Sequence, residues 1–590
     1  MASSPLVALE RLRNEFGAEA ASAKLALLGR LARARLGSAR SVLRLHEALC
    51  FIRAYPDDAE VLARVRSMLD GFAKRADLRA HREALADSGI AGTEIRWRFF
   101  AGQAQWLAER WPRRLRLDRR DPDAGERIAR ALAPLVTHAE ATALNELKPP
   151  GYAALDRLGG AGGKGGKGGA GGKGGAGGAG GKGETDAVFL LRRIAAMPGN
   201  GFTREAFTDT VDAAFVLLPG PDTPSRTAAW LRWAPVVLRG EPPPRARPEL
   251  RAQLARAPRS ARRLSLREGA EVAELARAAM ITRERSLEAF SFANARDAWL
   301  VDDGDGLAFA FTGVVPERRH ALASYYGGLT LRNGVPIGYS QCDLLGASAA
   351  LSFNTFETFR GMEAAYVFAR WLAALRHLFG AASFSIEPYQ LGKHNDEAIE
   401  SGAWWFYAKL GFAPRDRAAR DLARAEIDRV RRSPRHRTRP ATLRRLAERH
   451  LFFELDPAHP RPRVDLAALG MEVGATLSAR SGSDRERGVA EIGAELMQRC
   501  GAGSLRRFAP DEREAWRRIA PVLALLDLDD WHAGERRALV ELVRAKGGHS
   551  ERDYLIAYAG HPRLDASLLD WARANSPDGN VPVSLPKRSR

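Results

Sequence analysis

The turn between residues 359 and 365 has the composition of an anion-binding helix start. It reads Phe359-Arg360-Gly361-Met362-Glu363-Ala364-Ala365 and follows a predicted strand. The first backbone N–H groups of a helix have no partner within the helix, and together with the helix dipole they can hold phosphate oxygens. Glu363 stands inside this turn, where its carboxylate would repel a phosphate.

A second stretch with chemical potential runs from Asn395 to Phe412. It contains Asn395-Asp396-Glu397-Ala398 and, further on, Phe406-Tyr407-Ala408-Lys409-Leu410-Gly411-Phe412. Asn395 is a favourable N-cap, acidic residues suit the first turn that follows it, and Gly411 suits the end of a helix. A helix over residues 395–410 is therefore predicted. Tyr407, close to Trp404 and Trp405, is either a core aromatic or a reactive group.

These stretches, and the order of the predicted elements around them, resemble the GNAT superfamily of N-acetyltransferases over residues 264–415. In that family the pattern Q/R-x-x-G-x-G/A holds the pyrophosphate of coenzyme A. Arg360 and Ala365 match this pattern, and Glu363 stands where the first glycine belongs. The second stretch is similar to the asparagine and the aromatic-Tyr-x-Lys-Leu-Gly-Phe ending of the family, with a longer interval between them.

The resemblance implies transfer of an acyl group from acetyl-coenzyme A, or another acyl-coenzyme A, to an unknown amine. The residues that it assigns to donor binding are Arg360, Gly361, Met362, Glu363, Ala364, Ala365 and Asn395. It implies that Tyr407 protonates the leaving thiolate and that Glu357 or Glu387, acting through water, deprotonates the amine. A backbone N–H of the strand before Arg360 would stabilise the oxyanion.

The elements that must position these residues follow from a change in hydrophobic period after Phe292. Asn333-Gly334 is the strongest hairpin signal in the chain. A helix from Arg360 to Phe379, closed by Gly380, is expected between the last two strands, which should splay apart so that the Arg360 and Asn395 turns open on one edge. The predicted strands are Ala298–Val301, Leu307–Thr312, Leu329–Arg332, Val335–Tyr339, Ala349–Phe356 and Ser383–Tyr389.

With 590 residues the chain exceeds the size that one hydrophobic core usually serves. We predict an α+β fold in which a GNAT-like mixed sheet is embedded between large all-α regions. The predicted parts are a helical domain at 1–158, a disordered Gly/Ala/Lys linker at 159–184, a helical region at 185–263, the GNAT-like domain at 264–415, and an Arg-rich helical region at 416–590.

The net charge of +20 allows an anionic partner, although arginine is spread along most predicted helices and GC-rich coding alone would enrich it. One segment is denser than the rest. No acidic residue lies between Arg429 and Arg445, and prolines at 434 and 440 interrupt the helix, so i,i+4 carboxylates cannot neutralise all of these side chains. The basic surface expected here consists of Arg429, Arg431, Arg432, Arg435, Arg437 and Arg439.

Two other functions remain open beside acyl transfer. Glu363 favours a catalytically degenerate GNAT-like module used for binding or assembly, and the net charge favours an Arg-rich protein associated with nucleic acid or tRNA. The three cysteines are far apart, without CxxC or HExxH, which argues against a disulfide framework and a zinc site. With no apolar run of membrane-spanning length and no signal-like N-terminus, we expect a cytoplasmic protein without a membrane partner.

Overall fold

The computed structural model describes residues 4–159, 184–242, 247–361 and 363–575. Most of the predicted Gly/Ala/Lys linker, and Met362 of the predicted donor turn, lie outside these residues. The chain forms two compact units. The first comprises Met1–Pro242, Glu271–Phe292 and Arg332–Pro336, and the second comprises Pro243–Ala270, Ala293–Leu331 and Ile337–Arg590.

The first unit is mainly helical, as its amphipathic pattern predicts. A small antiparallel sheet of order β1-β3-β2 adds three short strands that the sequence did not suggest, namely Ile95–Trp97, Leu115–Leu117 and Phe215–Leu217. The longer helices are α1 Pro5–Leu12, α2 Ala18–Arg33, α3 Ala39–Ala54, α4 Ala59–Asp70, α6 Ala101–Arg110, α7 Pro122–Leu132, α8 His138–Leu147, α9 Tyr152–Leu158, α10 Asp186–Ala195 and α11 Gly201–Val211. Helix α13 Leu266–Ile281 belongs partly to each unit.

The second unit is built on an eight-stranded mixed sheet of order β11-β10-β9-β8-β7-β6-β5-β4. The α+β fold class is therefore as predicted. The strands are β4 Ser260–Arg263, β5 Ala293–Gly304, β6 Leu307–Val314, β7 Ser324–Arg332, β8 Val335–Leu345, β9 Ser348–Thr355, β10 Ser383–Ile386 and β11 Leu451–Glu454. Strand β4, in a segment predicted to be helical, pairs only with β5 and is exposed at every residue, so it has no apolar alternation that could reveal it.

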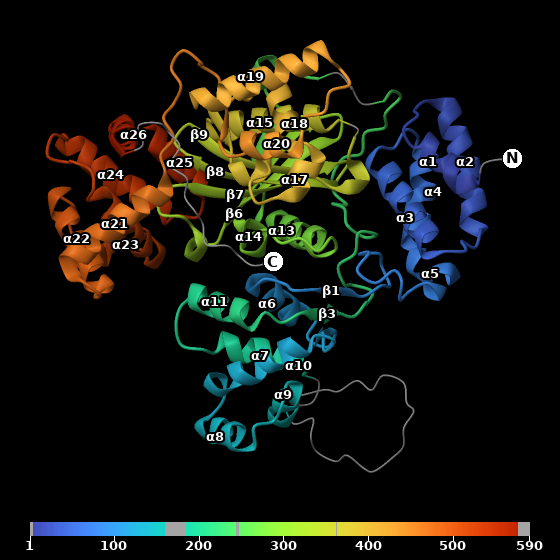
Figure 1. Ribbon diagram of the computed structural model, residues 1–590, viewed down its shortest axis with the longest axis horizontal. Helices are drawn as coiled ribbons and strands as arrows, with labels where there is room; N and C mark the ends of the chain where they lie inside the picture. Colours follow the sequence, from blue (N-terminus) through green and yellow to red (C-terminus); the bar gives the residue numbers. More distant parts are fainter. Residues whose placement is uncertain (1–3, 160–183, 243–246, 362, 576–590) are drawn as a thin grey trace. The chain divides into compact units, whose positions relative to one another are not determined.

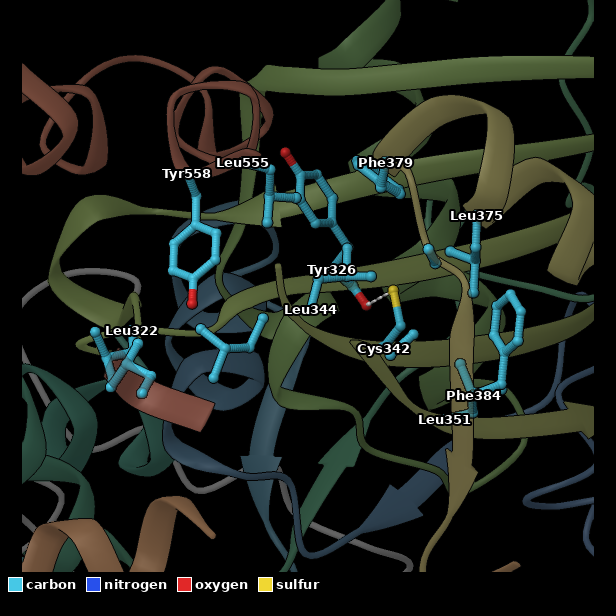
Figure 2. Close-up of a cluster of buried hydrophobic side chains, with 14 of the residues drawn as sticks. Leu322, Tyr326, Cys342, Leu344, Leu351, Leu375, Phe379, Phe384, Leu555 and Tyr558 are labelled. Atoms are coloured by element: carbon cyan, nitrogen blue, oxygen red, sulfur yellow. Dashed lines mark hydrogen bonds between the residues drawn. The ribbon is translucent and has the colours of Figure 1, made fainter. Parts of the chain in front are cut away.

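Helix α15, Ala364–Phe379, covers one face of this sheet and ends where predicted, at Gly380 with φ +78°. Its apolar stripe packs against the sheet. The Phe379 ring lies 5.5 Å from that of Phe311, and Phe368 lies 5.2 Å from Phe353. Figure 2 shows this core from Leu344 on β8 to Leu375 on α15, with Leu322 of the loop before β7 and Leu555 of a later helix in the same cluster.

The predicted helix at 395–410 is two helices. They are α17 Asp396–Ser401 and α18 Ala403–Lys409, and Gly402 between them has φ +68°, a left-handed conformation that ends the first helix. Before them, the short helix α16, Pro388–Leu391, replaces the end of the strand predicted to continue to Tyr389.

Further helices follow. Helix α19, Arg417–Arg432, contacts helix α20, Pro440–Leu446, which in turn contacts α17 (Figure 1). The C-terminal helices are α21 Leu466–Ser481, α22 Arg485–Arg499, α23 Pro510–Leu523, α24 Ala533–Lys546, α25 Glu551–Ala559 and α26 Pro562–Asn575. Their core is continuous with that of the sheet.

Buried charges join these C-terminal helices to the sheet. The carboxylate of Asp297 on β5 accepts hydrogen bonds from the Tyr326 hydroxyl (3.0 Å), the Ser550 hydroxyl (2.7 Å) and the Glu551 backbone N–H (2.9 Å). The Glu551 side chain pairs with Lys546 and accepts the Tyr325 N–H at 3.1 Å. Asp297, Lys546 and Glu551 are all at most 2 % exposed, so each charge depends on its partners.

Removing one member of this network should cost far more than removing both. Lys546→Met leaves the Glu551 carboxylate buried without its cation, which typically costs about 3–5 kcal/mol of unfolding free energy. Lys546→Met with Glu551→Gln removes both charges and should recover more than half of that loss. Urea unfolding followed by near-UV circular dichroism measures both variants.

Lys393→Met provides the control, because it breaks a surface pair with Glu448 of 3.0 Å between N and O. Such pairs contribute about 0–1 kcal/mol. Equal losses for Lys546→Met and Lys393→Met would contradict a stabilising role for the buried network.

Candidate functional site

The parallel pair β9 and β10 forms the edge at which the predicted residues meet. Their ladder runs from Ser348 opposite Ser383 to Leu351 opposite Ile386. β10 ends there, whereas β9 continues to Thr355, so the two chains leave the ladder separately. Because the carboxyl ends of parallel strands lie at one edge, the turns that follow them face the same side of the sheet.

An ion pair connects these two turns. The Arg360 guanidinium, after β9, lies 3.4 Å from the Glu397 carboxylate in the first turn of α17. It also donates a hydrogen bond from Nε to the Thr355 carbonyl at 3.3 Å. Gly361 has φ +84° with open space where a Cβ would stand. Arg360 is exposed, so its guanidinium remains accessible to an anion.

Glu363 differs from what donor binding in the usual GNAT manner requires. Such binding would require the carboxylate to turn outward, whereas the residue is only 4 % exposed at the N-cap position of α15. Its side chain makes no capping hydrogen bond. Ala364 and Ala365 form the first turn, where the helix supplies no acceptor for their N–H groups. The turn thus keeps donors for a phosphate and holds a carboxylate next to them.

Asn395 and Tyr407 have clear structural roles. The Asn395 side chain accepts the Ala398 N–H at 3.2 Å and donates to the Tyr389 carbonyl at 3.1 Å, so it caps α17 and fixes the preceding turn. Tyr407 is buried, with its ring 5.5 Å from Phe368 and 5.9 Å from Phe412. Burial raises the pKa of its phenol, so Tyr407 keeps its proton at neutral pH.

The two candidate bases have different surroundings. Glu357 lies exposed in a short 3-10 turn after β9. Glu387 directly follows β10 and is exposed; partial desolvation and the Asp343 carboxylate raise its pKa. A carboxyl group with a raised pKa is the better base near neutral pH. Glu387 is therefore the stronger candidate of the two.

The structure adds a titratable pair that sequence reasoning missed. His320, before β7, has its Nδ1 3.3 Å from the Asp343 carboxylate on β8, and its ring stacks on Tyr325 at 5.0 Å. The hydrogen bond and the charge of Asp343 raise the pKa of His320. The alternation Gln341-Cys342-Asp343-Leu344 could have placed Asp343 opposite the core face, but nothing in the local sequence points to His320.

A cavity of about 40 Å³ lies beside this pair and includes His320, Arg319 and Lys546 in its lining. None of the predicted donor-binding residues lines it. Arg319 is 5 % exposed, and its Nε and Nη2 have no hydrogen-bond partner among the described residues. The volume suits a few water molecules, which would satisfy these donors, and is far below the size of a cofactor pocket.

Among the described residues, no group of His, Cys, Asp and Glu could hold a metal ion, and no helix is long and apolar enough to cross a membrane. The three cysteines are free and buried. Comparison with protein-family models, with curated proteins and with solved structures gave no match to this chain. Arguments about function therefore rest on the residues of the site.

The Asp343 carboxylate should control two titrations at once. Asp343→Asn is expected to lower the pKa of both His320 and Glu387, because the negative charge raises both. His320 has a folded-state pKa above its ordinary value of 6.5, so its pairing stabilises the fold below that pH and the contribution disappears as pH rises through the raised pKa. NMR titration of the histidine ring protons, with His320→Gln for assignment, measures the shift. An unchanged His320 pKa in Asp343→Asn would contradict the pairing.

Proposed function

We propose that the second unit transfers an acyl group from an acyl-coenzyme A to an amine at the edge formed by β9 and β10. The observation that carries this proposal is the Arg360–Glu397 ion pair of 3.4 Å, which joins the turn after β9 to the helix start after β10. Two turns that open together beyond a short parallel ladder provide an exposed guanidinium and a helix start for phosphates.

In the proposed reaction, Glu387 after β10 and Tyr407 of α18 act as base and acid. Glu387, with its raised pKa, takes a proton from the ammonium of the acceptor through water. The amine nitrogen then attacks the thioester carbonyl and the C–N bond forms. As the C–S bond breaks, the nitrogen loses its second proton to water, which leaves a neutral amide. Tyr407 protonates the leaving thiolate, and its phenolate regains a proton from water.

Donor binding is the first test, by equilibrium dialysis with labelled acetyl-coenzyme A. Arg360→Ala should weaken binding by about 1–3 kcal/mol, or roughly 5- to 150-fold in Kd, because a charge-assisted contact is lost. Glu363→Gln keeps the shape of the side chain and removes its charge, so affinity should stay equal or rise. Arg563→Ala, at an exposed arginine of α26, is the matched control and should leave Kd unchanged.

A wild-type chain that retains no acetyl-coenzyme A would overturn the enzymatic proposal. It would favour a degenerate module in which the buried Glu363 serves stability. In that case Glu363→Gln would alter the melting temperature and leave donor binding absent.

The proton donor is tested by Tyr407→Phe. The substitution conserves ring volume in the aromatic core, so the melting temperature should change little. Release of coenzyme A thiol in the presence of an amine acceptor should slow by about 100-fold or more, because a general acid contributes on the order of 10²–10⁴ in rate. Release at the wild-type rate would assign Tyr407 to packing alone.

A further inference from the structure

A band of exposed arginines covers α19, the loop at 433–439 and α20. We call it the basic face; its exposed members are Arg417, Arg420, Arg424, Arg429, Arg431, Arg432, Arg435, Arg437, Arg439, Arg444 and Arg445. The predicted basic surface forms its central part, and the structure extends it along both helices. The segment contains no lysine. Arginine, with its planar fork of donors, suits bidentate contacts with phosphate.

Acidic side chains of the same segment do not balance this charge. Asp421, Asp428 and Glu448 are its exposed carboxylates; Asp428 lies 3.7 Å from Arg431, and Glu448 pairs with Lys393 at 3.0 Å. Arg444 pairs with Asp396 at 3.1 Å. Within the described residues, the following members of the basic face form no ion pair: Arg417, Arg420, Arg424, Arg432, Arg435, Arg437, Arg439 and Arg445.

A buried carboxylate fixes the loop that carries the middle of this face. Glu426 is 1 % exposed, lies 3.2 Å from His436 Nε2, and accepts the Thr438 hydroxyl at 3.0 Å. Thr438 also accepts the Trp405 indole N–H of α18 at 3.1 Å. The loop is thus held from inside, while its own arginines at 435, 437 and 439 stay exposed. The positive charge of these arginines is therefore carried by a loop whose backbone is held in place by buried contacts.

We propose that the basic face binds the phosphate backbone of a nucleic acid. Helix α19 has 16 residues and is about 24 Å long, a span along which a duplex presents many phosphates. The three phosphates of a coenzyme A would occupy only part of such a face. An array of arginines without matching carboxylates fits a long polyanion. This binding is independent of acyl transfer.

The basic face also reaches the edge described above. Asp396 and Glu397 are neighbours in the first turn of α17; Asp396 pairs with Arg444 of α20, and Glu397 pairs with Arg360. A nucleic acid on the basic face would lie next to the proposed donor turn. An amine carried by that nucleic acid is therefore the class of acceptor that the surface favours.

The test uses the full chain and a fluorescein-labelled RNA of about 20 nucleotides, with the DNA duplex of the same sequence as second probe, in fluorescence anisotropy at several salt concentrations. The wild type should bind, with log Kd rising steeply with log salt. The triple variant Arg435→Gln, Arg439→Gln and Arg445→Gln should weaken binding about ten-fold or more at low salt and reduce the salt slope by about 2–3.

The matched control is Arg506→Gln, Arg507→Gln and Arg537→Gln. These are three exposed arginines, two in the turn between α22 and α23 and one on α24, and their loss changes net charge equally. It should keep wild-type affinity and slope. The proposal is overturned if neither probe binds, if the two triple variants bind alike, or if labelled polyglutamate binds as tightly as RNA, which would assign the face to acidic protein. Equilibrium dialysis with acetyl-coenzyme A measures donor binding by itself, so a failure of nucleic-acid binding can be distinguished from a failure of the acyl-transfer proposal.

Discussion

The architecture of the second unit depends on a network of buried charged side chains. Asp297 on β5 and Glu551 at the start of α25 bring two carboxylates into the interior, and Lys546 at the end of α24 supplies a cation against them. Desolvation raises the pKa of Asp297 and lowers that of Lys546, so both groups would give up their charge if the contacts were lost. Such a network fixes register and orientation, because an apolar contact would tolerate sliding whereas these hydrogen bonds would not.

The consequences extend to the sheet itself. Tyr326 shares the Asp297 carboxylate and places its ring 4.6 Å from Phe379 at the end of α15. The position of α15 is therefore set at its C-terminal end by the same network that holds the C-terminal helices. Its N-terminal end adjoins the turn that begins at Arg360. A rigid helix transmits the constraint from the buried charges to the turn in which Glu363 is held.

The sequence predicted turns and helix ends correctly where the residue type favours a backbone conformation with positive φ. Asn333-Gly334 adopts φ of +51° and +76°, and the hairpin between β7 and β8 followed from that pair alone. Gly380 ends α15 for the same reason. Strand β4, by contrast, has no buried face, and the three strands of the first unit are too short to show a period. The left-handed φ of Gly402 divides the helix that was predicted over residues 395–410.

The site was predictable to the extent that its residues follow strands along the chain. Arg360, Glu387 and Asn395 come after β9 and β10 and lie at one edge for that reason. The contact between His320 and Asp343 could not be predicted, because it joins a loop before β7 to the last part of β8 and depends on the pairing of whole strands.

Glu363 is a residue whose effect on phosphate binding depends on both the sequence and the fold. The sequence revealed a carboxylate in a phosphate-type turn, but only the fold shows that it is buried. A buried carboxylate raises the electrostatic cost of binding any phosphate beside it. Arg360 is exposed and is positioned by Glu397, and its guanidinium can offset that electrostatic cost. Because an exposed ion pair contributes little free energy, the guanidinium can leave the Glu397 carboxylate and bind a phosphate at little cost. The balance between these two residues decides whether the turn binds a donor.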